Sequence, residues 1–225
     1  MNAAQHRAAG ASNGRGVIGV LKCAIQTRAA VRNAPPSRQA MTFQLALHPF
    51  STAEYHRMIE TGIFTEDDRV ELIDGEIVHI TAIGPRHAAC VDRLAELLRA
   101  KIGSLAIVRV QSPVQLSEHS EPQPDLSLLK RRADFYSQSH PTPESVLLAI
   151  EVADTTAEGD RQVKIPAYGR AGISEAWLVD LVEDRIEIYT ETNNGIYQEI
   201  KRVLRGQHVA SKALPQLKLK ANDIL

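Results

Sequence analysis

The chain has 225 residues, a formal net charge of −1 and two cysteines, Cys23 and Cys90. This length fits one domain with a tail, and two cysteines exclude a disulfide-built fold or a cysteine-based zinc site, so the expected location is a reducing cytoplasm. The apolar run at residues 17–25 contains Lys22 and is too short to cross a bilayer, so no membrane partner is expected.

The charge is distributed unevenly along the chain. Residues 1–53 contain six basic residues and no Asp or Glu, whereas the remainder carries 20 basic and 27 acidic residues. An acidic body matches a nucleic-acid backbone poorly, so such binding would need a local basic patch. We expect residues 1–45 to be a basic tail that is disordered, resembles a transit peptide or precedes a true start at Met41, and residues 46–225 to form the domain.

The first part of the predicted domain contains a helix, a hairpin and a second helix. Ser51 and Glu54 fit a capping box, which predicts a helix to about residue 60. Strand-like runs at 69–73 and 76–81 meet at an Asp-Gly pair, a strong hairpin signal. Pro85 suits the first turn of a helix, and apolar residues at helical spacing extend that helix to Gly103.

The second part alternates strands with one further helix. Apolar runs predict strands at the following residues: 106–111, 114–116, 126–129, 146–152, 176–181, 185–190 and 196–203. Residues 160–171 predict a helix that Pro166 interrupts, and Asn194-Gly195 predicts a second hairpin. The order indicates an α+β fold with a mixed β-sheet, flanking helices and additional β-hairpins.

Three separated residues are the main candidates for chemistry. Asp125 follows Pro124, Glu151 closes an apolar run, and Lys164 follows thirteen residues later. Mg²⁺ usually takes one or two protein carboxylates together with water and phosphate oxygens, and a lysine can offset charge in a phosphoryl transition state. The alternative is structural: Asp125 in a turn, Glu151 ending a strand and Lys164 on a solvated helix face.

The same residues lie within a longer pattern that resembles a known family. The matching segments are residues 71–76, 85–87, 124–125, 151–154, 160–164 and 168–180. Together they resemble the Uma-two family of restriction-endonuclease-like proteins, a group within the PD-(D/E)XK nuclease superfamily. The resemblance covers about residues 50–225. It implies a restriction-endonuclease-like core.

The resemblance also implies roles for individual residues. Asp125 and Glu151 would bind Mg²⁺, with Mn²⁺ as a substitute. The superfamily's usual lysine stands two residues after the second acid, where this chain has Ala153. Members of the family are thought to supply the lysine from the following helix, which points to Lys164. Glu71 matches an early acidic position, either as an additional metal or water ligand or as an outward-facing strand residue.

Other candidates have simpler explanations. Asp160 stands four residues before Lys164, so a helical ion pair is sufficient, and Tyr168 and Trp177 are expected in the core. His87 could shuttle a proton, but the expected role is that of a hydrogen-bonded structural histidine. The eight histidines show no local ligand spacing, so zinc is not indicated.

The chain also contains a short basic segment, and its residues leave three hypotheses for function. Residues 130–132 are basic and could contact a phosphate backbone with Arg161 and Arg170, or form a solvated loop. The leading hypothesis is a metal-dependent endonuclease acting on DNA, with a homodimer as a plausible assembly because cutting two strands often uses two sites. The alternatives are a catalytically inactive nuclease-fold module for nucleic-acid or protein binding, and a phosphoesterase acting on small substrates.

Overall fold

The computed structural model describes residues 47–65, 67–80 and 82–225. The predicted tail at residues 1–45 lies outside these residues, so the tail and the domain boundary remain predictions. The elements are α1 (Thr52–Glu60), β1 (Val70–Ile73), β2 (Glu76–His79), α2 (Pro85–Ile102), β3 (Ala106–Val110), β4 (Leu126–Lys130), η1 (Pro143–Ser145), β5 (Val146–Ala153), α3 (Ala157–Gly159), η2 (Asp160–Lys164), α4 (Ile165–Arg170), β6 (Glu175–Asp180), β7 (Arg185–Asn193), β8 (Ile196–Leu204), β9 (His208–Ala210), β10 (Lys218–Lys220) and η3 (Ala221–Asp223). Within the described ranges, no helix combines the length and apolar character needed to span a membrane.

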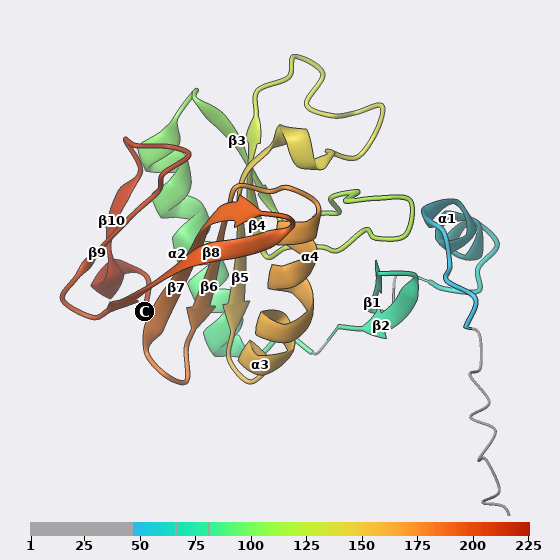
Figure 1. Ribbon diagram of the computed structural model, residues 1–225, viewed down its shortest axis with the longest axis horizontal. Coiled ribbons are helices and arrows are strands. Elements are labelled where there is room, and N and C mark those ends of the chain that lie inside the picture. Colours follow the sequence, from blue (N-terminus) through green and yellow to red (C-terminus); the bar gives the residue numbers. More distant parts are fainter. Residues whose placement is uncertain (1–46, 66, 81) are drawn as a thin grey trace, which may run out of the picture. The chain divides into compact units, whose positions relative to one another are not determined.

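A six-stranded sheet holds the domain together, in the order β3-β4-β5-β6-β7-β8 (Figure 1). Strands β5 and β6 run parallel, and the other neighbouring pairs of this sheet are antiparallel. A parallel pair needs a crossover connection, and here the helical stretch α3-η2-α4 supplies it. The predicted α+β fold with a mixed sheet is therefore confirmed.

Each face of the sheet is covered by a different part of the chain. Helix α2 packs its apolar stripe, including Leu94 and Leu98, on one face, and the β9-β10 hairpin and C-terminus join the same cluster (Figure 1). The crossover helix packs on the other face through Ile165, Ala167 and Tyr168. Burial of these apolar stripes against the sheet is the main source of stability for such a layered fold.

Strand β5 shows why a carboxylate is placed under the crossover helix. Side chains alternate between the faces of a strand, and Leu148, Ile150 and Val152 enter the cluster with α2. Ala149 and Ala153 enter the cluster beneath α4. Glu151 falls between these two alanines in the alternation, so this buried acid faces the crossover helix rather than α2.

The elements with the strongest local sequence signals form as predicted. The Ser51 hydroxyl accepts from the Glu54 backbone, and the Glu54 carboxylate accepts from the Ser51 backbone, so the capping box is present. Strands β1 and β2 pair through Asp74 and Gly75, with φ of 51° and 81°. A Cβ at Gly75 would lie 2.5 Å from Pro49 Cβ, so only glycine fits this turn.

One predicted strand is not formed, and two short strands were not predicted. Residues 114–116 do not form a strand, because this segment is the arm of a tight loop in which Leu116 N donates to Ser120 O and Val114 N donates to Pro122 O. The prolines that bracket this loop lack an N–H donor and cannot extend a ladder. The short strands β9 and β10 were not predicted, since three residues give too little alternation to recognise.

The predicted helix at 160–171 is also different in detail. It begins three residues earlier, at Ala157, and its middle is the π-helical turn η2, in which Ile165 N donates to Asp160 O. Pro166 cannot donate to the carbonyl four residues before it, and its ring crowds that turn. We attribute the wider turn to this proline, since π-turns accompany such interruptions in a helix.

Candidate active site

The four residues predicted as catalytic line a single pocket of about 620 Å³. Glu71 lies on β1, Asp125 immediately precedes β4, Glu151 lies on β5 and Lys164 ends the π-helical turn η2. All three acids are buried. The outward-facing alternative for Glu71 is therefore wrong, because every residue of β1 is buried.

Lys164 joins two of these acids. Its Nζ atom donates to Glu71 Oε1 at 3.0 Å and lies 3.4 Å from Glu151 Oε2. The Lys164 side chain is 14% exposed, so its ammonium is held in the pocket rather than on a solvated helix face. The structural alternative for this lysine is excluded by these contacts.

Tyr168 orients the second acid from the same helix face. Its hydroxyl donates to Glu151 Oε1, the carboxylate oxygen opposite the one that faces Lys164. Residues four apart share a face of a helix, so Lys164 and Tyr168 reach the same carboxylate together. The prediction that Tyr168 belongs to the core is confirmed, but this tyrosine also fixes an acid of the pocket.

Asp125 is held by donors from three elements. Its Oδ2 atom accepts from the Val152 backbone N–H at 2.9 Å and lies 3.0 Å from His87 Nε2. Gln111 Nε2 donates to Oδ1 at 3.2 Å. His87 stands in the first turn of α2, and its predicted role as a hydrogen-bonded histidine is confirmed.

The electrostatics of the pocket are dominated by burial of like charges. Burial raises the pKa of Glu71 and Asp160, and it raises that of Glu151 well above its ordinary value, although Lys164 opposes each shift. Burial lowers the pKa of Lys164, but the surrounding carboxylates outweigh it and raise the pKa above its usual range. Lys164 is therefore a fixed positive charge among the buried carboxylates of the pocket.

Asp125 shows the opposite shift from the other acids. Burial raises its pKa, but the hydrogen bond and charge of His87, with the bonds from Val152 and Gln111, bring it below its ordinary value. In turn, the hydrogen bond to Asp125 raises the pKa of His87 more than burial lowers it. Asp125 is thus the acid of the pocket best stabilised as a carboxylate.

Three further residues of the pocket had weak signals or were interpreted differently. Asp160 lines the pocket and accepts from Thr156 Oγ1 at 3.0 Å, while Lys164 bonds to other acids, so the predicted helical ion pair is wrong. Gln123 donates its backbone N–H to Glu71 Oε1 at 3.0 Å. Neither Gln111 nor Gln123 carries a local motif, except that Gln123 adjoins Pro124-Asp125.

Three arginines of the predicted basic surface are engaged in local contacts. Arg132 pairs with Asp134 and stacks over the Tyr136 ring at 4.1 Å, which fits a structured loop. Arg170 pairs with Asp74. Arg161 pairs with three acids, Glu158, Asp180 and Glu187. None of these three arginines lines the pocket, and their pairings leave less free positive charge on the predicted basic surface than the sequence suggested.

A mixed sheet that presents buried acids and a lysine in one pocket is typical of restriction-endonuclease-like proteins. The family model described as "Uma2: Putative restriction endonuclease" matches residues 52–222. The chain therefore belongs to this family, as its motifs predicted, and membership supports nuclease activity.

A solved structure shares the fold. It is described as a "putative nuclease belonging to DUF820" from Anabaena variabilis, and it superposes with a TM-score of 0.64 at 15% identity. The match covers 78% of this chain and 97% of that chain. No curated protein matches this chain in sequence.

Proposed function

We propose that this chain is an endonuclease that hydrolyses phosphodiester bonds in DNA with Mg²⁺, for which Mn²⁺ can substitute. The observation that carries the proposal is the convergence of Glu71, Asp125, Glu151 and Lys164 on one pocket, with the Lys164 ammonium between two of the acids. Family membership supports the nuclease class, and the metal, the substrate and the residue roles are our proposal.

The donor set fits a divalent cation. Five carboxylates line the pocket, and the basic groups beside them are Lys164, Arg69 and two histidines. Burial raises the pKa of three of these acids, Glu71, Glu151 and Asp160. Such an excess of buried carboxylate is costly unless a cation compensates it. Asp125 and Glu151 would hold the metal. When bound, Mg²⁺ neutralises charge on phosphate oxygens and lowers the pKa of a coordinated water.

Lys164 is proposed as the catalytic lysine because of its remaining hydrogen-bonding capacity. An ammonium has three N–H donors, and the contacts to Glu71 and Glu151 use two of them. The third donor is available to a phosphate oxygen or to the attacking water. A fixed cation at this position stabilises the charge that develops in a phosphoryl transition state.

Glu71 and Asp125 are proposed to keep this arrangement rigid. Glu71 accepts from Lys164 and from the Gln123 backbone through the same oxygen, which holds the ammonium against β1. Asp125 Oδ1 accepts one hydrogen bond, from Gln111, and a carboxylate oxygen has a second lone pair that could bind a cation. Glu71 would therefore contribute to catalysis in one of two ways, by positioning Lys164 or by acting as an additional ligand of the metal or its water.

Plasmid cleavage in Mg²⁺ or Mn²⁺ tests the proposal directly. The wild-type chain should convert supercoiled DNA to nicked and linear forms, and the conversion should stop in excess EDTA. Glu151→Gln, Asp125→Asn and Lys164→Ala should each reduce the rate by at least about 100-fold, the scale expected when a group that stabilises the transition state is lost.

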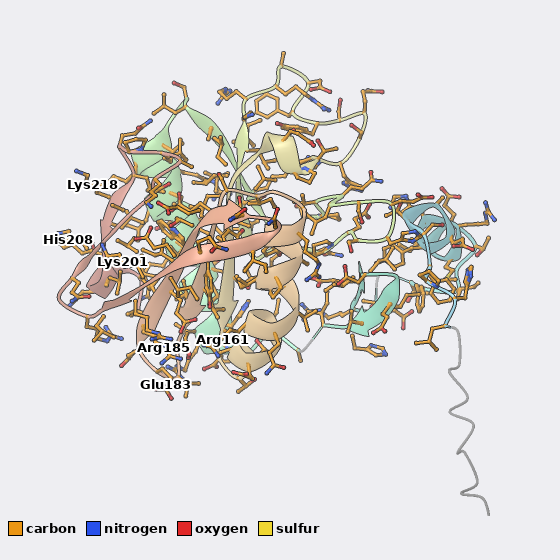
Figure 2. The ribbon with its side chains drawn as sticks, viewed as in Figure 1. Arg161, Glu183, Arg185, Lys201, His208 and Lys218 are labelled. Atoms are coloured by element: carbon orange, nitrogen blue, oxygen red, sulfur yellow. The ribbon has the colours of Figure 1, made fainter. Side chains whose placement is uncertain are left out.

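The matched control is an exposed lysine on the opposite side of the domain. Lys218 is exposed on β10 (Figure 2) and does not line the pocket, so Lys218→Ala should cleave at the wild-type rate. Absence of cleavage by the wild-type chain in either metal contradicts the proposal. Equal rates for the wild-type chain and the Glu151 and Lys164 variants contradict it as well.

A second candidate function is a catalytically inactive nuclease-fold module that binds nucleic acid or protein. The observation that favours it is the acidic body, in which Arg161 and Arg170 are already paired with acids. Calorimetry distinguishes the two proposals when combined with the cleavage assay. Mg²⁺ binding that Asp125→Asn abolishes, without cleavage of plasmid, single strands or nucleotides, would favour the binding module over the endonuclease.

A further inference from the structure

A second group of potential metal ligands lies outside the pocket described above. The side chains of His56, Glu121 and His140 each offer a ligand atom, and these three atoms lie within 4.8 Å of one another. We propose that they bind one Zn²⁺ ion. The site is separate from the proposed catalytic centre, and the inference does not depend on the endonuclease activity.

Glu121 is the central member of this zinc site. Its side chain is 3% exposed, and one atom, His56 Nε2, contacts its oxygens at 2.8 Å and 3.0 Å. Within the described residues, no group other than His56 is hydrogen-bonded to the Glu121 carboxylate. A buried carboxylate with a single imidazole partner still has free lone pairs that can bind a cation.

His140 completes the set from a different loop. Its ring lies edge-on to that of His56, with centroids 6.1 Å apart and an interplanar angle of 62°. Two imidazoles and one carboxylate from three segments therefore point at a common volume. No spacing motif marks this group in the sequence, because its members are distant along the chain and His56 and Glu121 alone are 65 positions apart.

The backbone around each ligand is fixed by hydrogen bonds. His56 follows Tyr55 on α1, and the Tyr55 hydroxyl donates to Val70 O at 3.0 Å. Glu121 N donates to Leu72 O at 2.7 Å. Pro141, which follows His140, accepts from Gln115 N at 2.9 Å. Ligands held on a prepared framework lose little entropy on binding a metal, which favours affinity.

The arrangement leaves room for a further ligand. His56 and His140 line a pocket of about 620 Å³ with polar neighbours that include Ser137 and Gln138. None of the residues that line this pocket also lines the catalytic pocket. A water molecule could therefore occupy a fourth coordination position without disturbing the proposed catalytic centre.

The chemistry of the ligands selects the metal. Two imidazole nitrogens and one carboxylate oxygen with an open position are a known ligand set for Zn²⁺, whereas Mg²⁺ prefers oxygen ligands throughout. Binding would join α1 to the segments that carry Glu121 and His140. Because Glu121 stands four residues before Asp125, the same ion would help to fix the segment that leads into the catalytic pocket.

The test is titration of the metal-stripped full-length chain with Zn²⁺ in the presence of millimolar Mg²⁺, followed by calorimetry. We expect one equivalent of Zn²⁺ to bind in the wild-type chain and in the Asp125→Asn/Glu151→Gln variant. At a Zn²⁺ concentration about 100 times Kd, the melting temperature should rise by about 5–10 °C. Co²⁺ bound in place of Zn²⁺ should give visible d–d absorption.

Substitution of a proposed zinc ligand tests whether the ion binds at this group. His140→Ala should weaken Zn²⁺ binding by at least about 100-fold and abolish the thermal shift, since it removes one of three protein ligands. His208→Ala is the control, because His208 is exposed on β9 at the far end of the domain from α1 (Figure 2). Circular dichroism checks folding, and His140→Gln replaces His140→Ala if the latter is misfolded.

Three results would overturn the proposal. The first is no Zn²⁺ binding to the wild-type chain at micromolar concentrations. The second is binding that a folded His140 variant retains in full. The third is Zn²⁺ binding that disappears in the Asp125→Asn/Glu151→Gln variant, which would place the ion in the catalytic pocket.

Discussion

Replacing Lys164 with methionine should destabilise the metal-free protein strongly. Methionine keeps most of the side-chain volume but removes the charge that lies 3.0 Å from Glu71 Oε1 and 3.4 Å from Glu151 Oε2. At an effective dielectric constant of about 20, each of these contacts contributes about 5 kcal/mol of Coulomb energy, and the cost of burying the ammonium offsets several kcal/mol of the total. Removing one partner of such a buried group costs about 3–5 kcal/mol.

Urea unfolding at neutral pH with EDTA measures this loss. For a slope of about 2 kcal/mol per molar urea, the midpoint should fall by about 2 M. The double variant Lys164→Met/Glu151→Gln should regain a large part of the loss, because it no longer leaves that carboxylate buried without a partner. Lys218→Met should leave the midpoint unchanged, since its side chain is exposed.

A loss of stability below about 1 kcal/mol would contradict this prediction, because it would mean that water or a counterion already compensates the two acids. The prediction would also be contradicted if the double variant Lys164→Met/Glu151→Gln were no more stable than Lys164→Met. In that case the lysine would stabilise the protein through packing of its methylene groups rather than through charge.

Three other predictions follow from contacts outside the pocket. Ser51→Ala removes the helix cap and should lower stability by about 1 kcal/mol, a fall of about 2–4 °C in a thermal melt. Burial raises the pKa of Glu187, but hydrogen bonds from Tyr189 and Arg161 outweigh it and hold the pKa below its ordinary value. Glu187 therefore stabilises the fold above its unfolded pKa, and this stability is lost as the pH falls through its lower folded pKa, so the difference in urea midpoint from Glu187→Gln should shrink on acidification. Burial raises the pKa of the Cys90 thiol to about 11, so in a Cys23→Ser background iodoacetamide should label the chain only in denaturant.

The Glu187 prediction draws on an arginine cluster at one end of the sheet. Figure 2 shows Arg161 and Arg185 at the same end, and both pair with Asp180 and Glu187. This prediction is contradicted if the urea midpoints of the wild-type chain and Glu187→Gln change in parallel as the pH is lowered. Labelling of folded Cys90 at the rate of the denatured chain would contradict the alkylation prediction.

The sequence was sufficient where the signal was local. The capping box at Ser51, the Asp-Gly turn at residues 74–75 and the proline that opens α2 each act through their own backbone, so each could be placed correctly. The strand β5 was equally clear, because a strand buried on both faces is a continuous apolar run. An α+β fold follows from the order of these elements.

The sequence was insufficient where distant segments meet. Glu71 and Lys164 are 93 positions apart, and their contact depends on how β1 packs beside the crossover helix. The zinc site is a similar case, since local spacing describes only ligands that one helix or loop supplies. The absence of a spacing motif therefore says nothing about ligands drawn from separate segments.

The position of the lysine can be understood from the packing of β5 and the crossover helix. Ala153, two residues after Glu151 on β5, is fully buried in the cluster with Ile165 and Tyr168. A long charged side chain at this position would have to displace that cluster. The helix that covers Ala153 instead extends from a π-turn, and Lys164 at the end of this turn reaches the acid two residues earlier on the strand. The helix that excludes a lysine from the strand thus places another ammonium beside Glu151, so the proposed chemistry does not require a lysine at position 153.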